Sequence, residues 1–401
     1  MKLSDRKIFH FNPTCEIAIA NGSPYYLAPA LLREFEEELA PIMMFFASEQ
    51  DHVLKNEAVP DKFIDTMAKV GFFNSKILSK DASLEIIKPK NEFVELNPWG
   101  WSPAELNYLL PFNQRENRQQ RSENITKQSL FERKHAVGLV SKLITKNSHP
   151  LFPKVEQLPV LMNSVERIEA YLDKYQQMVL KSPLSSSGRG IQLIRKNKLN
   201  ESNKRWIKTN LTQQGYLIAE PIFNKKMDLS FQFEFKLSGQ IDFLGTSFFE
   251  TNNNGQYLGH HLNYFRQNEE KYLNENELNS IANLILQQLN NSILKKHYYG
   301  FLGVDALVYE ENKQIKIHPC LEINPRYNMG ILSKNIENRI HQESTGIFQV
   351  YYHPTDNFVD FAKNETKKNP PFMADQKLIK GFVPITAPTR KSKFGAFVKL
   401  F

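Results

Sequence analysis

The sequence contains only two cysteines, Cys15 and Cys320, among its 401 residues. Two cysteines are too few for the disulfide framework that stabilises small secreted domains, so the composition favours a reducing compartment. The sequence also lacks a run of about 18 uncharged apolar residues, the minimum for a membrane-spanning helix. Its first residues show no apolar stretch followed by a small-residue cleavage site, as a signal peptide would. We therefore expect a cytoplasmic protein without a membrane partner.

Charge of one sign is not concentrated anywhere in the chain. The 51 basic and 43 acidic residues give a net charge of +8. This balance suits an anionic ligand, but it equally suits nucleic acid or an anionic membrane surface. The basic residues are scattered, and no long basic helix or aromatic–basic RNA-binding pattern is present. We therefore expect small-molecule partners and no nucleic acid.

The length of the chain indicates two or three packed lobes. In the first segment, a strand over residues 7–11 precedes a helix over 28–39 with apolar residues at helical spacing. The apolar run Pro41–Phe46 reads as a buried strand. Such alternation predicts a small open α/β lobe, which we place over residues 1–125 because residues 114–127 are polar and lack periodicity.

Most later elements are also readable from apolar spacing and turn residues. A strand that alternates from Leu229 to Phe235 has phenylalanines on one face and polar residues on the other. The remaining predictions are helices over 128–146, 165–172 (with Ser164 as N-cap) and 277–295, short strands over 178–181, 190–194 and 217–220, and a hairpin of 302–309 with 315–323.

The first chemical signal is a serine- and glycine-rich loop that follows Lys181. Backbone N–H groups of small residues can converge on phosphate oxygens, and the serine hydroxyls add donors. Lys181, which ends the preceding strand, can reach the phosphates as a point charge. The order is not that of a Walker A loop, because the lysine precedes the glycines. A flexible hairpin turn without a ligand is the alternative interpretation.

The second signal is a pair of carboxylates on the predicted hairpin. With the turn centred between Lys313 and Gln314, Asp305 lies opposite Glu322, and Asn324 shares the face of Glu322. Carboxylate and amide oxygens suit Mg²⁺, which takes one or two protein carboxylates plus substrate phosphates. Arg326, just beyond, could bind a phosphoryl group or a carboxylate. The alternative is an exposed hairpin with an incidental salt bridge.

Taken in order, these motifs resemble the ATP-grasp superfamily. The resemblance covers about residues 128–335, and its most specific part is the sequence Glu322-Ile323-Asn324-Pro325-Arg326 at the end of a hairpin. It implies the following roles: Lys181 contacts the α- and β-phosphates; Ser185, Ser186, Ser187, Gly188, Arg189 and Gly190 cover the triphosphate; Glu220, Pro221 and Ile222 border adenine; Asp228 binds the ribose hydroxyls; Asp305, Glu322 and Asn324 hold one or two Mg²⁺ ions; Arg326 steadies the transferred phosphoryl group.

The sequence departs from the family pattern in one place and leaves one role contested. The loop is serine-rich where many members are glycine-rich, which loosens the assignment of individual loop donors. The family also places a basic residue near the nucleotide on the helix that leads into the fold. Arg133, Lys134 and Lys142 compete for this role, and we choose Lys134. For each residue taken singly, a solvated helix face is the alternative.

The resemblance implies an α/β (α+β) fold in which two lobes clasp ATP, preceded by the open α/β lobe. We place the ATP-grasp domain over residues 126–340, with the small lobe at 126–200 and the large lobe at 201–340. Residues 341–401 are expected to form an appended segment with edge strands. The expected activity is that of an ATP- and Mg²⁺-dependent carboxylate–amine ligase acting through an acyl phosphate, with amino acids or peptides as candidate substrates. A phosphotransferase and a non-catalytic ATP-binding protein stay open as alternatives.

Overall fold

The computed structural model describes residues 6–72, 75–90, 94–112, 127–147, 149–185, 190–252, 255–267 and 272–401. The chain divides into two compact units. Unit 1 comprises Met1–Thr126, Leu258–Glu269 and Arg326–Phe401, and unit 2 comprises Lys127–Tyr257 and Glu270–Pro325. The polar stretch in which we placed the first boundary lies, apart from Lys127, outside the described residues. In the described part of the chain, no helix has the length and apolarity needed to cross a bilayer.

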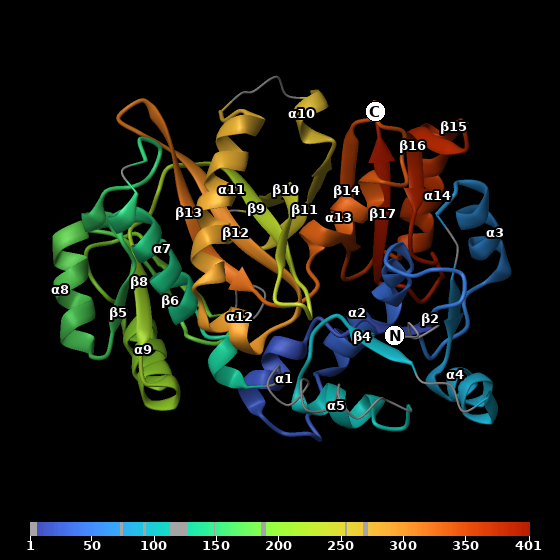
Figure 1. Ribbon diagram of the computed structural model, residues 1–401, viewed down its shortest axis with the longest axis horizontal. Helices are drawn as coiled ribbons and strands as arrows, with labels where there is room; N and C mark the ends of the chain where they lie inside the picture. Colours follow the sequence, from blue (N-terminus) through green and yellow to red (C-terminus); the bar gives the residue numbers. More distant parts are fainter. Residues whose placement is uncertain are drawn as a thin grey trace. The chain divides into compact units, whose positions relative to one another are not determined.

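The N-terminal part of unit 1 is built around a four-stranded sheet in the order β3-β2-β1-β4 (Figure 1). All three strand pairs are parallel. The open α/β lobe expected from the sequence is therefore present. Its elements are β1 (Lys7–His10), α1 (Cys15–Asn21), α2 (Ala30–Leu39), η1 (Ala40–Phe45), β2 (His52–Leu54), α3 (Asp61–Lys69), β3 (Lys76–Leu78), α4 (Lys80–Ile87), η2 (Lys88–Lys90), β4 (Glu95–Pro98) and α5 (Pro103–Leu109).

The prediction of a strand at Pro41–Phe46 is wrong. Pro41–Phe45 instead lies in the 3₁₀ helix η1, which continues directly from α2 and whose residues are all buried. A short, continuous apolar run is compatible with either a buried strand or a buried helical segment, so periodicity alone does not distinguish them. Pro41 lies in the first turn of η1, where its missing N–H has no partner to lose.

The C-terminal part of unit 1 contributes strands in the order β11-β14-β17-β16-β15. We expected edge strands at 380–385 and 397–400, but β16 lies between β15 and β17, and β17 lies between β14 and β16, so neither is an edge strand. Residues 341–401 are also more than an appendage, because Phe348 and Val398 share one hydrophobic core with Phe9 of β1. The elements are β11 (Tyr257–Leu262), α10 (Tyr264–Gln267), α13 (Met329–Glu337), β14 (Gly346–Tyr352), α14 (Phe358–Lys368), β15 (Phe372–Ala374), β16 (Lys377–Pro384) and β17 (Phe394–Leu400).

Unit 2 contains a small sheet in the order β5-β8-β6-β7. Its core joins residues of helices α8 and α9 to the strands, and both helices lie beside this sheet in Figure 1. Because β8 pairs with β5 and β6, the small lobe extends beyond the boundary that we placed at residue 200. Its elements are β5 (Val160–Met162), α8 (Val165–Tyr175), β6 (Met178–Lys181), β7 (Ile191–Ile194), α9 (Glu201–Gln214) and β8 (Leu217–Glu220).

The other strands of unit 2 form an antiparallel array in the order β13-β12-β9-β10. The helix predicted over 277–295 is divided in two, since α11 ends at Asn290 and a short helix begins after Ser292. The elements are η3 (Gln128–Leu130), α7 (Lys134–Lys146), η4 (Val155–Gln157), β9 (Lys225–Phe235), β10 (Ile241–Thr251), α11 (Glu275–Asn290), α12 (Ile293–His297), β12 (Gly300–Glu311) and β13 (Gln314–Asn324).

Strand alternation gives this array one apolar and one polar face. Phe231 and Phe233 of β9 pair with Val304 and Leu302 of β12, and all four side chains are buried. The residues between them point to the opposite face, where Ser230 of β9 pairs with Asp305. The predicted alternation is confirmed, and it places the candidate metal ligands on the polar face.

Candidate nucleotide and metal site

The hairpin of β12 and β13 sets the register of the candidate metal ligands. Its turn lies at Asn312 and Lys313, which both have positive φ, one residue earlier than the sequence indicates. Asp305 nevertheless faces Glu322, as predicted, because a β-bulge lies between this pair and the pair Leu307–His318. Pro319 falls within the bulge, where a missing N–H removes no ladder hydrogen bond.

Asp305 and Asn324 are in direct contact, since Asn324 Nδ2 donates to Asp305 Oδ2 at 2.9 Å. Glu322 accepts from Arg133 Nη2 at 2.6 Å. No group of three or more His, Cys, Asp or Glu side chains in the described residues could hold a metal ion. Two carboxylates and an amide oxygen are nevertheless a donor set that fits Mg²⁺, because this ion takes its remaining ligands from water and phosphate.

Two further polar groups lie beside the triad on the same face. Among the described residues, Ser230 Oγ and Gln232 Oε1 are buried without a hydrogen-bond partner. Gln232 Nε2 does donate to Ser247 Oγ at 3.1 Å. A buried polar atom without a partner is uncommon in folded proteins and marks a place where a ligand, ion or water can bind. These two residues were not singled out from the sequence.

Lys181 forms a buried ion pair with Glu220. The Lys181 Nζ to Glu220 Oε2 distance is 2.7 Å, and the side chains are only 9% and 6% exposed. The two residues lie on the adjacent antiparallel strands β6 and β8, which brings the groups together. Lys181 Nζ also lies 3.5 Å from the carbonyl oxygen of Leu321 on β13. These two contacts place the Lys181 ammonium between β8 of the small sheet and β13.

The loop after Lys181 closes through a tight backbone contact. Ser182 N donates to the Gly190 carbonyl at 2.8 Å. A Cβ atom at Gly190 would overlap Ser182 Oγ and Ser185 Cβ, so glycine is required there by close packing. The predicted loop contacts at Ser186, Ser187, Gly188 and Arg189 lie outside the described residues.

Arg133 connects this loop to Glu322 on β13. Its Nη1 donates to the Ser182 carbonyl at 2.8 Å and to Ser185 Oγ, while Nη2 binds Glu322. Lys134, the residue we chose from the sequence, pairs with Glu132 at 2.8 Å and is 42% exposed. Lys134 and Lys142 line a separate cavity beside α11 and α12. The contacts thus favour Arg133 over Lys134 as the basic residue beside the phosphate loop. Only a rigid guanidinium fork makes all of these hydrogen bonds at once.

The candidate adenine and ribose residues follow β8. Pro221 and Ile222 are half-buried in the connection between β8 and β9. Asp228, at the start of the buried part of β9, accepts from Lys225 Nζ and Thr251 Oγ1, both at 2.7 Å. Its carboxylate is therefore held in place by two side chains.

His318 is a buried residue of this region that the sequence did not indicate. Its ring lies 5.6 Å from that of Phe223, and neither ring nitrogen has a hydrogen-bond partner among the described residues. Burial, with a smaller contribution from the charge of Lys181, lowers the pKa of His318 to about 3. The imidazole is therefore neutral at physiological pH.

No protein-family model matches the sequence, and no curated protein is significantly similar to it. Solved structures, in contrast, match over the whole chain. The N5-carboxyaminoimidazole synthetase of Staphylococcus aureus is 12% identical with a TM-score of 0.51, and the match covers 100% of this chain and 94% of that one. The biotin carboxylase domain of 2-oxoglutarate carboxylase from Hydrogenobacter thermophilus, in complex with MgADP, ADP and bicarbonate, is 11% identical with a TM-score of 0.51, covering 100% and 87%. The biotin carboxylase of Campylobacter jejuni, in complex with β,γ-ATP, has the same identity and TM-score, covering 99% and 87%. The chain has an ATP-grasp fold.

In this chain with an ATP-grasp fold, Arg326 is the second residue after β13 and belongs to unit 1. Its Nε donates to Glu16 Oε1 at 2.9 Å, and its Nη1 donates to the Tyr327 carbonyl at 3.1 Å. Both contacts lie within unit 1. The predicted role of Arg326 at a phosphoryl group therefore stays a prediction, and the structure adds Glu16 as the residue that orients the guanidinium.

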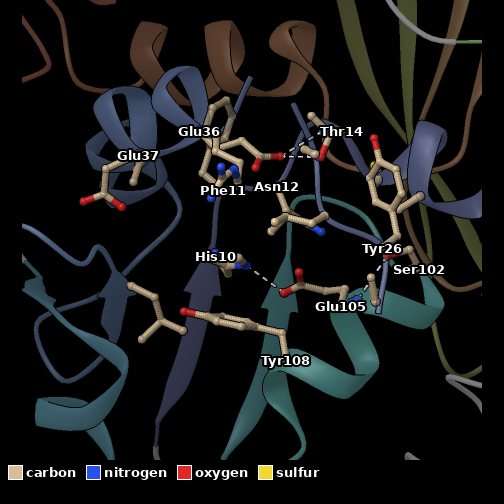
Figure 2. Close-up of a pocket in the computed structure, with 18 of the residues that line it drawn as sticks. His10, Phe11, Asn12, Thr14, Tyr26, Glu36, Glu37, Ser102, Glu105 and Tyr108 are labelled. Carbon is tan, nitrogen blue, oxygen red and sulfur yellow. Dashed lines mark hydrogen bonds and ion pairs between the residues drawn. The ribbon is translucent and has the colours of Figure 1, made fainter. Parts of the chain in front are cut away.

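Unit 1 also contains a cavity of about 290 Å³ next to the end of β1 (Figure 2). Asn12, Thr14 and Cys15, which follow β1 in the chain, line this cavity. Asn12 pins the loop after β1 to the loop after β4, because its side chain donates to the Gly100 carbonyl and accepts from Gly100 N. These two hydrogen bonds fix the loop after β1, which lines the cavity, to the loop after β4.

The cavity contains a histidine–carboxylate pair. His10 Nδ1 lies 2.8 Å from Glu105 Oε1, and the His10 ring stacks on Tyr108 at 4.7 Å between ring centroids. Burial lowers the pKa of His10, but the charges of Glu105 and, more weakly, Glu36 and Glu37 outweigh it, so that the pKa is raised. Local sequence patterns did not predict this pair, because His10 and Glu105 are far apart in the chain.

Proposed function

We propose that the protein is an ATP- and Mg²⁺-dependent ligase that joins a carboxylate to an amine. The observation that carries this proposal is the convergence of Asp305, Glu322 and Asn324 on one face, with Arg133 bridging that face to the phosphate loop. A protein that only bound ATP would not need this complete set of acidic and basic groups. The fold similarity supports the proposal but does not carry it.

In the proposed complex, Lys181 and the N–H groups of the loop from Ser185 to Gly190 bind the phosphates of ATP. Pro221 and Ile222, together with the backbone of Glu220, border adenine, and Asp228 accepts from the ribose hydroxyls. Asp305, Glu322 and Asn324 would hold one or two Mg²⁺ ions, which neutralise phosphate charge. In the absence of nucleotide, Glu220 holds the charge of Lys181 in place.

The proposed reaction has two steps. The substrate carboxylate attacks the γ-phosphorus of ATP, which forms an acyl phosphate and releases ADP. The amine then attacks the acyl carbon, loses a proton, and expels inorganic phosphate as the C–N bond forms. The contribution of the chain is positioning and charge neutralisation: Arg133 and Lys181 face the phosphates, and Arg326 remains the proposed contact to the phosphoryl group.

The test is nucleotide turnover by the purified full-length protein with MgATP and a panel of carboxylates and amines. We expect ADP and phosphate to form only when both co-substrates are present, with a new amide detected by mass spectrometry. Asp305→Asn and Glu322→Gln should each lower turnover by roughly 10²–10³-fold or more. Glu310→Gln, at the other end of the hairpin in an ion pair with Lys226, is the matched control and should stay active.

The alternatives predict different products. A phosphorylated hydroxyl acceptor would make the protein a phosphotransferase on the same scaffold. Binding of MgATP without turnover on any co-substrate would favour a non-catalytic ATP-binding protein. Failure to bind MgATP would contradict the proposal altogether.

A further inference from the structure

The cavity of unit 1 occupies the position in its sheet where open α/β folds bind ligands. Its walls come from the end of β1 at His10, the end of β2 at Leu54, and the start of α5 after β4. From β1 the chain continues to β2 on one side, and β4 is added on the other side. The loops therefore diverge between β1 and β4, and such a switch point leaves a crevice at the carboxyl ends of the strands.

The size of the cavity limits what can bind. A volume of about 290 Å³ is close to the lower limit of ligand pockets, which span about 300–1,000 Å³. Tyr26 and Tyr108 supply aromatic surface, and Ala18 and Ala104 supply small apolar surface. The cavity therefore suits a small molecule with some apolar character rather than a nucleotide.

Two carboxylates supply the negative charge of the walls. Glu105 is 4% exposed and contacts His10 through Oε1. Glu36 accepts from both Thr14 N and Thr14 Oγ1 (Figure 2), and both bonds end on Oε1, which leaves Oε2 as the oxygen for a ligand. A third carboxylate, Glu37, is neutralised by Lys55 at 2.8 Å. Glu36 and Glu105 are thus the groups that can bind a cationic ligand.

A bare metal ion does not fit these groups, because the described residues hold no cluster of three or more His, Cys, Asp or Glu side chains close enough to coordinate one. An ammonium group does fit, since it needs hydrogen-bond acceptors and a nearby aromatic face rather than a closed coordination shell. The Glu36 pKa is raised, mainly by burial and in smaller part by the Glu105 charge. A ligand cation would relieve both effects.

A basic residue lies on the same wall. Arg33, one helical turn before Glu36 and Glu37 on α2, lines the cavity and is exposed. An exposed guanidinium at the rim suits a carboxylate, which it can bind through two parallel hydrogen bonds. The walls therefore present acceptors for an ammonium and a donor for a carboxylate within one small space.

We propose that this cavity binds a free amino acid, with its ammonium group held by Glu36 and Glu105 and its carboxylate by Arg33. The amino acid would supply the amine of the ligase reaction, and in that respect alone the inference rests on the proposed function. Binding itself requires neither ATP nor Mg²⁺.

The test is isothermal titration of the full-length protein, without nucleotide, against each common L-amino acid. We expect one or a few to bind at up to millimolar concentration, and the N-acetyl derivative of each binder to be roughly tenfold weaker or worse, because it lacks the ammonium. Glu36→Gln and Arg33→Met should each weaken binding by a similar factor. Glu34→Gln is the matched control on the same helix, since Glu34 pairs with Lys393 and does not line the cavity.

A second variant distinguishes a loss of binding from misfolding. Ala104→Leu adds volume at a half-buried cavity position on α5 and should abolish binding while the circular dichroism and melting temperature stay those of wild type. Absence of binding to any amino acid, or equal binding of the N-acetyl derivatives and in Glu36→Gln, would overturn the inference. Amino-acid binding without ATP turnover would contradict the ligase and leave this site standing. Turnover with another amine, and no amino-acid binding, would do the reverse.

Discussion

The polar face of unit 2 and the cavity of unit 1 are assembled in opposite ways. On the polar face, Asp305, Glu322 and Asn324 lie on one hairpin and meet through strand pairing. In the cavity, His10 contacts Glu105, which is 95 residues away in the chain. The first arrangement depends on local register, and the second depends on several strands ending at the same edge of a sheet.

This difference determines how each site responds to change. A hairpin site depends on a few backbone hydrogen bonds and on the side chains that pair across the strands. A site at strand ends depends on the loops that hold the strands' extensions together, here the contact of Asn12 with Gly100. The ion pairs, glycines and histidines of the two units allow the contrast to be measured.

The largest expected effect is the loss of the buried ion pair in unit 2. Lys181→Met leaves the Glu220 carboxylate buried without its partner, which should lower the free energy of unfolding by about 3–5 kcal/mol. His10→Gln removes the imidazole beside Glu105 in unit 1, where the histidine is 23% exposed, and should cost less, about 1–3 kcal/mol. Urea unfolding measures both. Equal losses would show that exposure does not govern these two pairs.

A smaller contrast is expected between neighbouring basic residues at the start of α7. Arg133→Met removes charge-assisted hydrogen bonds to Glu322 and to the loop at Ser182, worth about 1.5–3 kcal/mol. Lys134→Met removes one ion pair of a partly exposed lysine, so its cost should stay below about 1 kcal/mol. Thermal unfolding of the two variants compares them directly. A larger loss in the lysine variant would contradict the greater structural role that the contacts give Arg133.

Glycine substitutions test the close packing of each unit. Gly190→Ala places a methyl group against Ser182 and Ser185, and Gly100→Ala places one against Cys15. Each should cost about 1–3 kcal/mol of unfolding free energy. Gly138→Ala, within α7, meets no atom within 4 Å and should instead stabilise by about 0.5–1 kcal/mol through helix propensity. Stability unchanged by both of the first two substitutions would mean that the loops relax freely.

The pH dependence of stability should carry opposite signs from the two units. His318 has a folded pKa of about 3, below the unfolded value of 6.5, so acidification protonates the unfolded state first. Its contribution should weaken by up to about 1.4 kcal/mol per pH unit below pH 6.5. The pKa of His10 is raised, so its contribution is complete below 6.5 and is lost as the pH rises through the folded value.

The measurement is urea unfolding from about pH 5 to about pH 8 for wild type, His318→Gln and His10→Gln. The first variant should flatten the acidic side of the profile, and the second should flatten the alkaline side. Because burial also lowers the pKa of His260 to about 3, some acidic slope should persist in His318→Gln. Parallel profiles for all three proteins would contradict both assignments.

The sequence allowed the fold class and the pairing of Asp305 with Glu322 to be predicted, because both depend on local patterns. Alternation along β9 and the spacing around the hairpin turn are visible in the residues themselves. The pairing of Asp305 with Glu322 was correct although the turn was placed one residue late, because the bulge at Pro319 compensates. The bulge itself was not predictable, since proline is compatible with several strand irregularities.

Features that depend on tertiary contacts were missed for physical reasons. Arg133 and Lys134 are neighbours with similar charge, and only the position of the loop decides which one meets Glu322. Pro41–Phe46 is apolar throughout, so its conformation is set by the packing around it. The place of β17 inside its sheet follows from its pairing with β14, in which Phe348 pairs with Val398. These two residues are 50 positions apart in the chain, a distance at which sequence patterns carry no pairing information.

Unit 1 is built from segments that are separated in the sequence, and this has a consequence for biosynthesis. Phe9 near one end and Val398 near the other belong to the same hydrophobic core, whereas unit 2 lies between them in the sequence. A ribosome therefore delivers all of unit 2 before it delivers the residues that complete unit 1. The part of the core that contains both Phe9 and Val398 cannot form before the ribosome has added β17. Deletion of β17 should thus destabilise unit 1, even though every residue of unit 2 is present.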